Sequence, residues 1–160
     1  MASALKSLSE YNSENIPSGK GLRIAIVVSE YNSDITFNLL NGCIETLTQH
    51  GVKENHIYVS YVPGAYELTY GAKIASKNNK VHAIICLGCV IKGDTDHDKY
   101  INHAVAQGIT NVSLQIDRPV VFGLLTPNNH EQAVDRSGGK HGNKGVEAAV
   151  TALKTAALNK

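Results

Sequence analysis

The sequence has almost no net charge and no long apolar segment. Fifteen Lys and Arg residues against 14 Asp and Glu residues leave a formal net charge of +1, which is too small to favour a nucleic-acid or membrane surface. No apolar run approaches the roughly 18 residues of a membrane-spanning helix, and the N-terminal segment has no apolar core of signal-peptide length. We therefore expect a cytoplasmic protein that binds neither nucleic acid nor membranes, and we interpret residues 1–20 as a loosely held arm.

Cysteine is scarce and odd in number. The three residues are Cys43, Cys86 and Cys89, and an odd count without an export signal argues against a disulfide framework. Cys86 and Cys89 match C-x-x-C, but redox pairs of that kind usually lie where a helix starts. This pair lies in a strand-like run, where the two side chains should face opposite sides, and no second C-x-x-C completes a zinc site. A packing role is favoured over a redox or metal role.

Apolar strand-like segments alternate with segments of helical periodicity. With 160 residues, 42% of them hydrophobic and 18% charged, the chain suits one globular domain, which we place at 21–160. Four alternations imply right-handed βαβ units and a three-layer α/β/α fold of flavodoxin-like type, in which helices cover both faces of a four-stranded parallel sheet. The predicted strands are 22–28, 57–62, one within 82–91, and 119–125; the predicted helices are 33–50, 66–78, from 95 to beyond 108, 129–137 and 145–158.

Polar segments follow each predicted strand. Ligands of open parallel sheets bind beyond the carboxyl ends of the strands, so the site is expected at SEYNSD (29–34), VPGAYE (62–67), GCVIKGDTDH (88–97) and LTPNNHE (125–131). We expect Ser33 or Asp34 to cap the first helix.

The segment GDTDH (93–97) combines a turn glycine with polar groups at a helix start. Asp94 or Thr95 is a suitable N-cap, and the free N–H groups of the first turn suit a phosphate. His97 in that turn is placed for proton transfer near neutral pH. The alternative is a solvated helix start whose acids complement the helix dipole. A metal site is disfavoured because His97 and His103 face different sides of the helix and no H-x-x-x-H pair occurs here.

Two other segments offer groups for a flat, hydroxylated ligand. Tyr31 can stack on a ring, although an exposed tyrosine is more often a rim residue. The Pro63-Gly64 turn leaves backbone groups open, and Glu67 can accept hydrogen bonds from hydroxyls, although the segment also suits an ordinary βα turn.

The glycine-rich segment DRSGGKHGNKG (135–145) carries three basic residues besides one acidic residue and a histidine. It does not align with a Walker sequence, but the guanidinium of Arg136 can bind phosphate oxygens in pairs, and Lys140 and Lys144 add positive charge. The alternative is a flexible interhelical loop. No G-x-G-x-x-G follows the first strand, which disfavours a dinucleotide-binding fold.

Taken in order, the segments GLRIAIVVSEYN, VPGAYEL, LGCVIKGDTDH, VFGLLT and DRSGGKHGNKG resemble the 6,7-dimethyl-8-ribityllumazine synthase family, from about Gly21 to the C-terminus. The resemblance implies a transferase of riboflavin biosynthesis. Such an enzyme condenses 5-amino-6-(D-ribitylamino)uracil with 3,4-dihydroxy-2-butanone 4-phosphate, releases phosphate and water, and uses no metal or organic cofactor.

The resemblance also implies residue roles. It assigns proton transfer to His97; the pyrimidine and its ribityl chain to Tyr31, Ala65, Tyr66, Glu67, Cys89, Val90, Ile91, Phe122 and Lys144; and the phosphate to Asp94, Thr95 and Arg136. The stacking position is usually Phe or Trp in the family, whereas this chain has Tyr31. Because a carboxylate repels a phosphate, we expect Asp94 to offer its backbone N–H and to turn its side chain toward Lys92 or Arg136.

The family further implies a homo-oligomer. Phe122 and Arg136 resemble residues that reach the ligand from an adjacent subunit, which predicts a pentamer with shared sites. The uninterrupted GGKHGNKG turn favours a shell of 60 subunits, while Pro17 argues against it. Riboflavin synthase is a candidate partner.

Two alternatives to the enzyme function remain. One is a non-catalytic lumazine or flavin binder, which would need no phosphate-binding arginine. The other is a phosphate-binding regulatory module, which would lack Tyr31 and Phe122 as a pair of rings enclosing the ligand.

Overall fold

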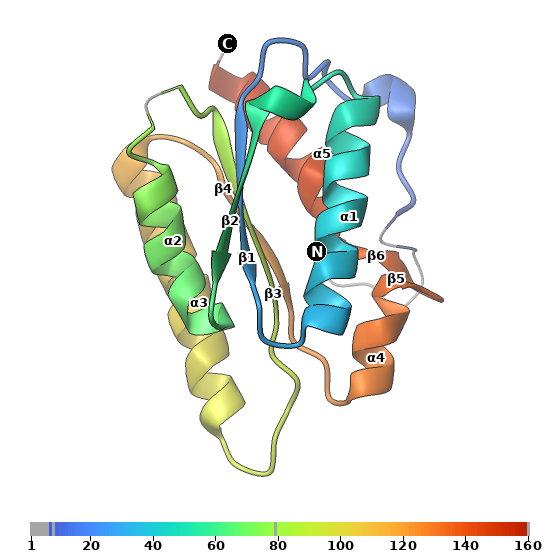
Figure 1. Ribbon diagram of the computed structural model, residues 1–160, viewed down its shortest axis with the longest axis vertical. Coiled ribbons are helices and arrows are strands. Elements are labelled where there is room, and N and C mark those ends of the chain that lie inside the picture. The colour runs from blue at the N-terminus through green and yellow to red at the C-terminus, as the bar shows by residue number, and fades with distance from the viewer. Residues whose placement is uncertain (1–6, 8, 79, 160) are drawn as a thin grey trace.

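A four-stranded parallel sheet forms the centre of the computed structural model, which describes residues 7, 9–78 and 80–159 (Figure 1). The strands are β1 (Ile24–Ser29), β2 (Ile57–Val62), β3 (Ala83–Cys89) and β4 (Val120–Leu125), in the order β2-β1-β3-β4. All neighbours pair in parallel. The predicted three-layer fold is confirmed, because helices flank this sheet on both faces.

Helices α2 (Leu68–Ala75) and α3 (His97–Ile116) cover one face, and α1 (Ser33–Gln49), α4 (His130–Asp135) and α5 (Lys144–Ala156) lie on the other (Figure 1). Short 3-10 helices occur at η1 (Ser13–Asn15), η2 (Glu54–His56), η3 (Ala65–Glu67) and η4 (Ala157–Asn159). None of the helices in the described part of the chain combines the length and apolar character needed to span a membrane.

The core consists of two apolar clusters, one on each face of the sheet. Successive residues of the central strands alternate between them: Ile24 and Ile26 pack toward α1 and α5, while Ala25 and Val27 pack toward α2 and α3. Every residue of β1 and β3 is buried. Full burial of one large aliphatic side chain contributes about 1.5–3 kcal/mol, so these two strands hold the layers together.

Two predicted helix caps are wrong. The cap of α1 is Asn32, which has a left-handed backbone (φ 57°), and not Ser33 or Asp34. Asn32 takes this conformation because its side-chain amide donates to the carbonyl of Cys89, at 3.0 Å. Helix α3 begins only at His97 with Asp96 as its cap, because Asp94 and Thr95 form a bend ahead of the first turn.

The glycine-rich segment contains a hairpin that the sequence did not predict. Strands β5 (Ser137–Gly139) and β6 (Gly142–Asn143) pair antiparallel, and Gly138 and Gly142 both have positive φ angles, which glycine adopts without strain. The Asn143 amide donates to the carbonyls of Asn38 and Ser137. The start of α5 is thereby tied to α1.

Part of the N-terminal arm packs on the domain. Ile16 is buried, the ring of Tyr11 lies 5.7 Å from that of His50, and the Ser9 hydroxyl accepts from the backbone N–H of Asn143. Residues 1–6 and 8 of the predicted arm lie outside the described residues, and the domain boundary at residue 20 stays a prediction.

Arg118 joins the end of α2 to the start of β4. Its guanidinium donates to three backbone carbonyls, those of Ser76 at 2.7 Å, Val81 at 3.0 Å and Asn78 at 3.2 Å. These carbonyls belong to the connection between α2 and β3. One half-buried side chain therefore fixes a turn on the α2 and α3 side of the sheet.

We expect Arg118→Ala to lower the free energy of unfolding by about 2 kcal/mol, because three carbonyls lose a charged donor. Urea titration measures this loss. Arg23→Ala is the control, since its guanidinium makes no hydrogen bond to any described residue, and it should cost less than about 1 kcal/mol. An equal loss in both variants would contradict the role assigned to Arg118.

Candidate active site

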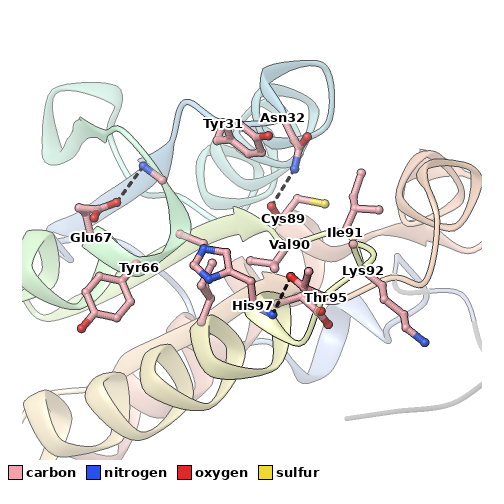
Figure 2. Close-up of a pocket in the computed structure, with 15 residues that line it drawn as sticks. Tyr31, Asn32, Tyr66, Glu67, Cys89, Val90, Ile91, Lys92, Thr95 and His97 are labelled. Carbon is pink, nitrogen blue, oxygen red and sulfur yellow. Dashed lines mark hydrogen bonds between the residues drawn. The ribbon is translucent and has the colours of Figure 1, made fainter.

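A cavity of about 580 Å³ opens at the carboxyl end of the sheet, between the segments that follow β1, β2 and β3 (Figure 2). Its position agrees with the expectation that a ligand binds beyond the strand ends. Nine predicted site residues line it: Tyr31, Ala65, Tyr66, Glu67, Cys89, Val90, Ile91, Thr95 and His97.

The segment after β1 is held by both neighbouring strands. The backbone N–H groups of Glu30 and Tyr31 donate to the carbonyls of Val62 and Pro63, and Asn32 donates to Cys89 (Figure 2). The ring of Tyr31 remains 72% exposed at the cavity, so one of its faces is open to a flat ligand. Asn32 also lines the cavity and was not among the predicted site residues. Its signal was an asparagine three residues after the end of a strand, in a segment expected at the site, since asparagine tolerates positive φ angles.

The turn after β2 presents a carboxylate. One oxygen of Glu67 accepts from the backbone N–H of Gly64 at 3.1 Å, which fixes the side chain against the turn. Ala65 is buried beneath it and Tyr66 is 61% exposed at its side. The Glu67 carboxylate keeps further acceptor capacity for hydroxyl groups of a ligand.

The residues at the end of β3 form an apolar wall of the cavity. The backbone N–H of Val90 donates to the carbonyl of Leu125, and that of Lys92 to the carbonyl of Pro127, so the strand continues alongside β4 beyond its formal end. Burial raises the pKa of the Cys89 thiol to about 12, with a smaller contribution from the Asp34 carboxylate. Burial alone raises the pKa of Cys86 to about 12.

The predicted packing role of the C-x-x-C pair is supported. Cys86 belongs to the cluster beneath α2 and α3, and Cys89 to the cluster beneath α1 and α5. Their side chains therefore face opposite sides of the sheet, as predicted, and all three cysteines are free and buried.

The segment after β3 leads into α3. His97 is exposed and lines the cavity, and its backbone N–H lies 3.5 Å from the Thr95 hydroxyl, which accepts it. Asp94 is exposed and does not line the cavity. Among the described residues its side chain contacts neither Lys92 nor Arg136 through a hydrogen bond or ion pair, so the expected orientation of Asp94 is not observed.

The remaining three predicted residues lie elsewhere. Phe122, Arg136 and Lys144 line a second cavity of about 1130 Å³ beside β4 and α5. The Arg136 guanidinium donates to the carbonyl of Gln132 at 3.1 Å, and the Lys144 ammonium pairs with the Glu147 carboxylate at 2.6 Å. Within one chain, Arg136, the arginine predicted to bind phosphate, therefore does not line the cavity that holds His97.

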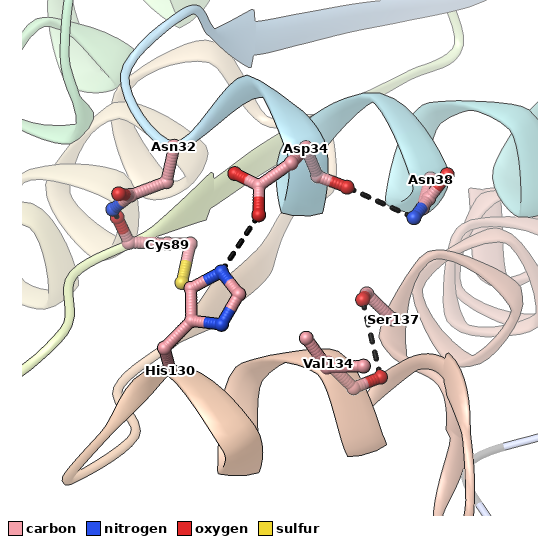
Figure 3. Close-up of polar contacts among 7 residues, drawn as sticks. All are labelled: Asn32, Asp34, Asn38, Cys89, His130, Val134 and Ser137. Carbon is pink, nitrogen blue, oxygen red and sulfur yellow. Dashed lines mark hydrogen bonds and ion pairs between the residues drawn. The ribbon is translucent and has the colours of Figure 1, made fainter.

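A histidine and a carboxylate connect α1 with α4. The imidazole Nε2 of His130 lies 2.7 Å from Oδ2 of Asp34 (Figure 3). The pair joins α1, which follows Asn32, to α4, which precedes Arg136. The segment after β1 and the segment after β4 are therefore linked beyond the strand ends.

No group of three or more His, Cys, Asp and Glu side chains suited to a metal ion occurs within residues 7, 9–78 and 80–159.

Known proteins resemble this chain along its whole length. A family model described as 6,7-dimethyl-8-ribityllumazine synthase matches residues 21–160. A protein of that name from Porphyromonas gingivalis is 50% identical over 160 residues, which are all of this chain and 99% of the relative. Proteins of the same name from Cytophaga hutchinsonii and Parabacteroides distasonis are 51% and 49% identical over 154 residues, 96% of each chain compared.

The raised pKa values of Cys86 and Cys89 predict unreactive thiols. The thiolate is the nucleophile, and a thiol of pKa near 12 is ionised in only about one molecule in ten thousand at about pH 8. A coloured disulfide reagent should therefore label the folded chain slowly and all three cysteines quickly in concentrated urea. Because unfolded thiols ionise near pH 9, their contribution to stability is complete below that pH and is lost as the pH rises toward 12. A rapidly labelled thiol in the folded chain would contradict this reading.

Proposed function

Since the chain belongs to the 6,7-dimethyl-8-ribityllumazine synthase family, we propose that its two cavities are halves of one active site, each half supplied by a different copy of the chain. The reaction condenses 5-amino-6-(D-ribitylamino)uracil with 3,4-dihydroxy-2-butanone 4-phosphate and releases phosphate and water. It is the penultimate step of riboflavin biosynthesis. The observation that carries the shared site is the separation of Arg136 and Phe122 from His97 within one chain.

The first cavity suits the pyrimidine substrate. Tyr31 offers a ring face for stacking, Cys89, Val90 and Ile91 form the wall along the edge of the uracil, and Glu67 accepts from ribityl hydroxyls. Ala65 and Tyr66 complete the turn beside the ribityl chain. Phe122 of the neighbouring copy closes over the ring, since it is 38% exposed on an edge strand.

The phosphate lies, in this proposal, between Thr95 at the start of α3 and Arg136 of the neighbouring copy. The first N–H groups of a helix and a guanidinium fork both favour phosphate oxygens. Lys144 adds positive charge on the neighbour's side. The side chain of Asp94 has no role in this arrangement, and its backbone is the part that lies near the phosphate turn.

The chemistry requires proton transfers and alignment. The aromatic amine adds to the ketone and loses water to form a Schiff base, phosphate is eliminated, and the ring closes with loss of water. His97 exchanges the protons of these steps, because it lies at the cavity on the first turn of α3. Holding two reactants in register lowers barriers by about 7–11 kcal/mol in favourable model reactions, so the binding groups contribute alongside His97.

The shared site requires an oligomer. Head-to-tail contacts between unlike surfaces form a ring when the rotation closes, and we propose a pentamer. We further propose that pentamers form a 60-subunit shell, because the 138–145 turn carries no insertion and folds as a compact hairpin.

The same proposal includes a cytoplasmic location. It also includes riboflavin synthase, the enzyme of the final step, as a partner. Fluorescence of the lumazine on mixing both substrates tests the activity, and light scattering tests the assembly.

His97→Ala should lower turnover by about 10²-fold or less, because alignment of the substrates persists when the proton-transfer group is removed. Steady-state formation of the fluorescent product measures this. His103→Ala, an exposed histidine of the same helix outside the cavity, should change turnover less than twofold or so. Unchanged turnover in His97→Ala would remove the proposed proton-transfer role.

Mixed oligomers test the shared site. When His97→Ala and Arg136→Ala chains are co-expressed, about one interface in four pairs an intact His97 with an intact Arg136 of its neighbour. We therefore expect about a quarter of wild-type activity, above the mean of the two weakened parents. If each site belonged to a single chain, the mixture would show only the mean of the two parents.

A further inference from the structure

The polar segment after β4 supplied none of the predicted site residues. This segment (125–131) leads into α4, and its His130 pairs with Asp34 in the first turn of α1, with 2.7 Å between Nε2 and Oδ2 (Figure 3). Both side chains are 60% exposed, and an exposed pair contributes little to the stability of a fold. The consequence of the pair lies rather in what it positions.

Arg136 is bonded to the backbone of α4. Its backbone N–H donates to the carbonyl of Ala133 at 3.1 Å, and its guanidinium donates to the carbonyl of Gln132 at 3.1 Å. The start of the helix is closed by Asn129, whose side chain accepts from the backbone N–H of Gln132 at 2.9 Å. The place of the guanidinium is therefore set by the place of α4 as a whole.

The pair connects α4 with a distant part of the chain. Within the described residues, the other hydrogen bonds of α4 all stay inside the segment 128–141. Ala133 is buried in the apolar cluster beneath α1 and α5, but apolar contacts have no preferred direction. A directional contact between α4 and the rest of the fold is supplied by His130 and Asp34.

Asp34 is itself held by the sheet, because the first turn of α1 is bonded to two strand ends. The hydroxyl of Thr36 donates to the carbonyl of Ser29, the last residue of β1, at 2.7 Å. The amide of Asn32 donates to the carbonyl of Cys89, the last residue of β3, at 3.0 Å. The carboxylate therefore has a defined place at the carboxyl edge of the sheet, and the histidine bonded to it aligns α4 with that edge.

We propose that His130 and Asp34 are positioning residues for Arg136, and that they align its guanidinium with the phosphate of the butanone phosphate in the neighbouring copy's cavity. A guanidinium fork binds phosphate oxygens in pairs, which requires a defined plane and distance. Neither residue of the pair lines the two cavities, so the pair acts through the arginine and not on a substrate. This inference rests on the proposed function, in which Arg136 serves a neighbour's site.

The first test compares both Michaelis constants. His130→Ala should raise the KM for the butanone phosphate about three- to fivefold, as expected for loss of an exposed pair, and should change the KM for the ribitylaminouracil less than about twofold. His130→Gln should restore the wild-type KM, because its amide can donate to Asp34 from the place of Nε2 without a positive charge. A glutamine variant as impaired as the alanine variant would overturn the positioning role.

Glu131→Ala is the matched control. Glu131 is the next residue of α4, it is exposed, and its side chain has no hydrogen-bond or ion-pair partner among the described residues. The variant should leave both constants within about twofold of wild type. A rise in the butanone phosphate KM equal to that of His130→Ala would mean that any change on α4 disturbs the site, which would overturn the specific role of the pair.

Double variants show whether the pair acts through Arg136. In an Arg136→Ala chain, His130→Ala should not raise the butanone phosphate KM further, since no guanidinium is left to align. Combining His130→Ala with Asp34→Ala should raise that KM no more than His130→Ala alone. If turnover of Arg136→Ala is too slow to assay, calorimetric Kd values for inorganic phosphate provide the same comparison.

The outcomes separate this inference from the proposed function. A further rise of about three- to fivefold in the Arg136→Ala chain, or an unchanged KM in His130→Ala, would overturn the positioning role and leave the proposed function intact. An unchanged butanone phosphate KM in Arg136→Ala itself would instead contradict the phosphate-binding role of Arg136 in the proposed function.

Discussion

The burial of β1 and β3 on both faces governs where the chemistry of this chain can lie. Every residue of these strands is enclosed between helices, and an ionised group placed there would lose its hydration without a partner. The acidic and basic side chains that line the cavity therefore come from the segments that follow the strands. Parallel strands bring those segments to one edge of the sheet, and Tyr31, Glu67 and His97 meet there although they are far apart in the sequence.

The edge strand β4 is less completely buried than β1 and β3. Its residues are buried except Phe122, which lies with the exposed Leu114 along a shallow hollow between β4 and α3. Apolar side chains grouped at an open edge are stabilised when another surface covers them. In the proposed assembly the same contact brings Phe122 and Arg136 to a neighbour's cavity. Association and catalysis would then depend on one surface, and a chain that failed to associate would hold only half of its catalytic groups.

Local patterns predicted the elements but not the contacts that adjust their ends. β2 was predicted to the residue and the other strands within a few residues, because apolar runs and helical periodicity are local signals. The cap at Asn32 depends on a carbonyl 57 residues away, and the β5–β6 hairpin is tied to α1 through an asparagine 105 residues from its acceptor. Resemblance supplied most of the site residues, yet the bond that holds Asn32 at the cavity emerged only from the folded chain, because it depends on a strand that is distant in the sequence.

The cations of the second cavity differ in how free they are to hold an anion. Lys144 and Glu147 form a largely buried pair, with side chains only 13% and 16% exposed, so the Lys144 ammonium is already held by a carboxylate. Arg136 gives one nitrogen to the carbonyl of Gln132 and keeps further donors of its planar fork. In the proposed site, Arg136 is thus the better phosphate ligand, with Lys144 contributing through its electrostatic field. Arg136 follows α4, and His130 of α4 pairs with Asp34 of α1, so Arg136 is linked to the polar segment that carries Tyr31 and Asn32. In the proposed assembly, the arginine that reaches a neighbour's cavity is therefore coupled to the segment that lines the cavity of its own chain.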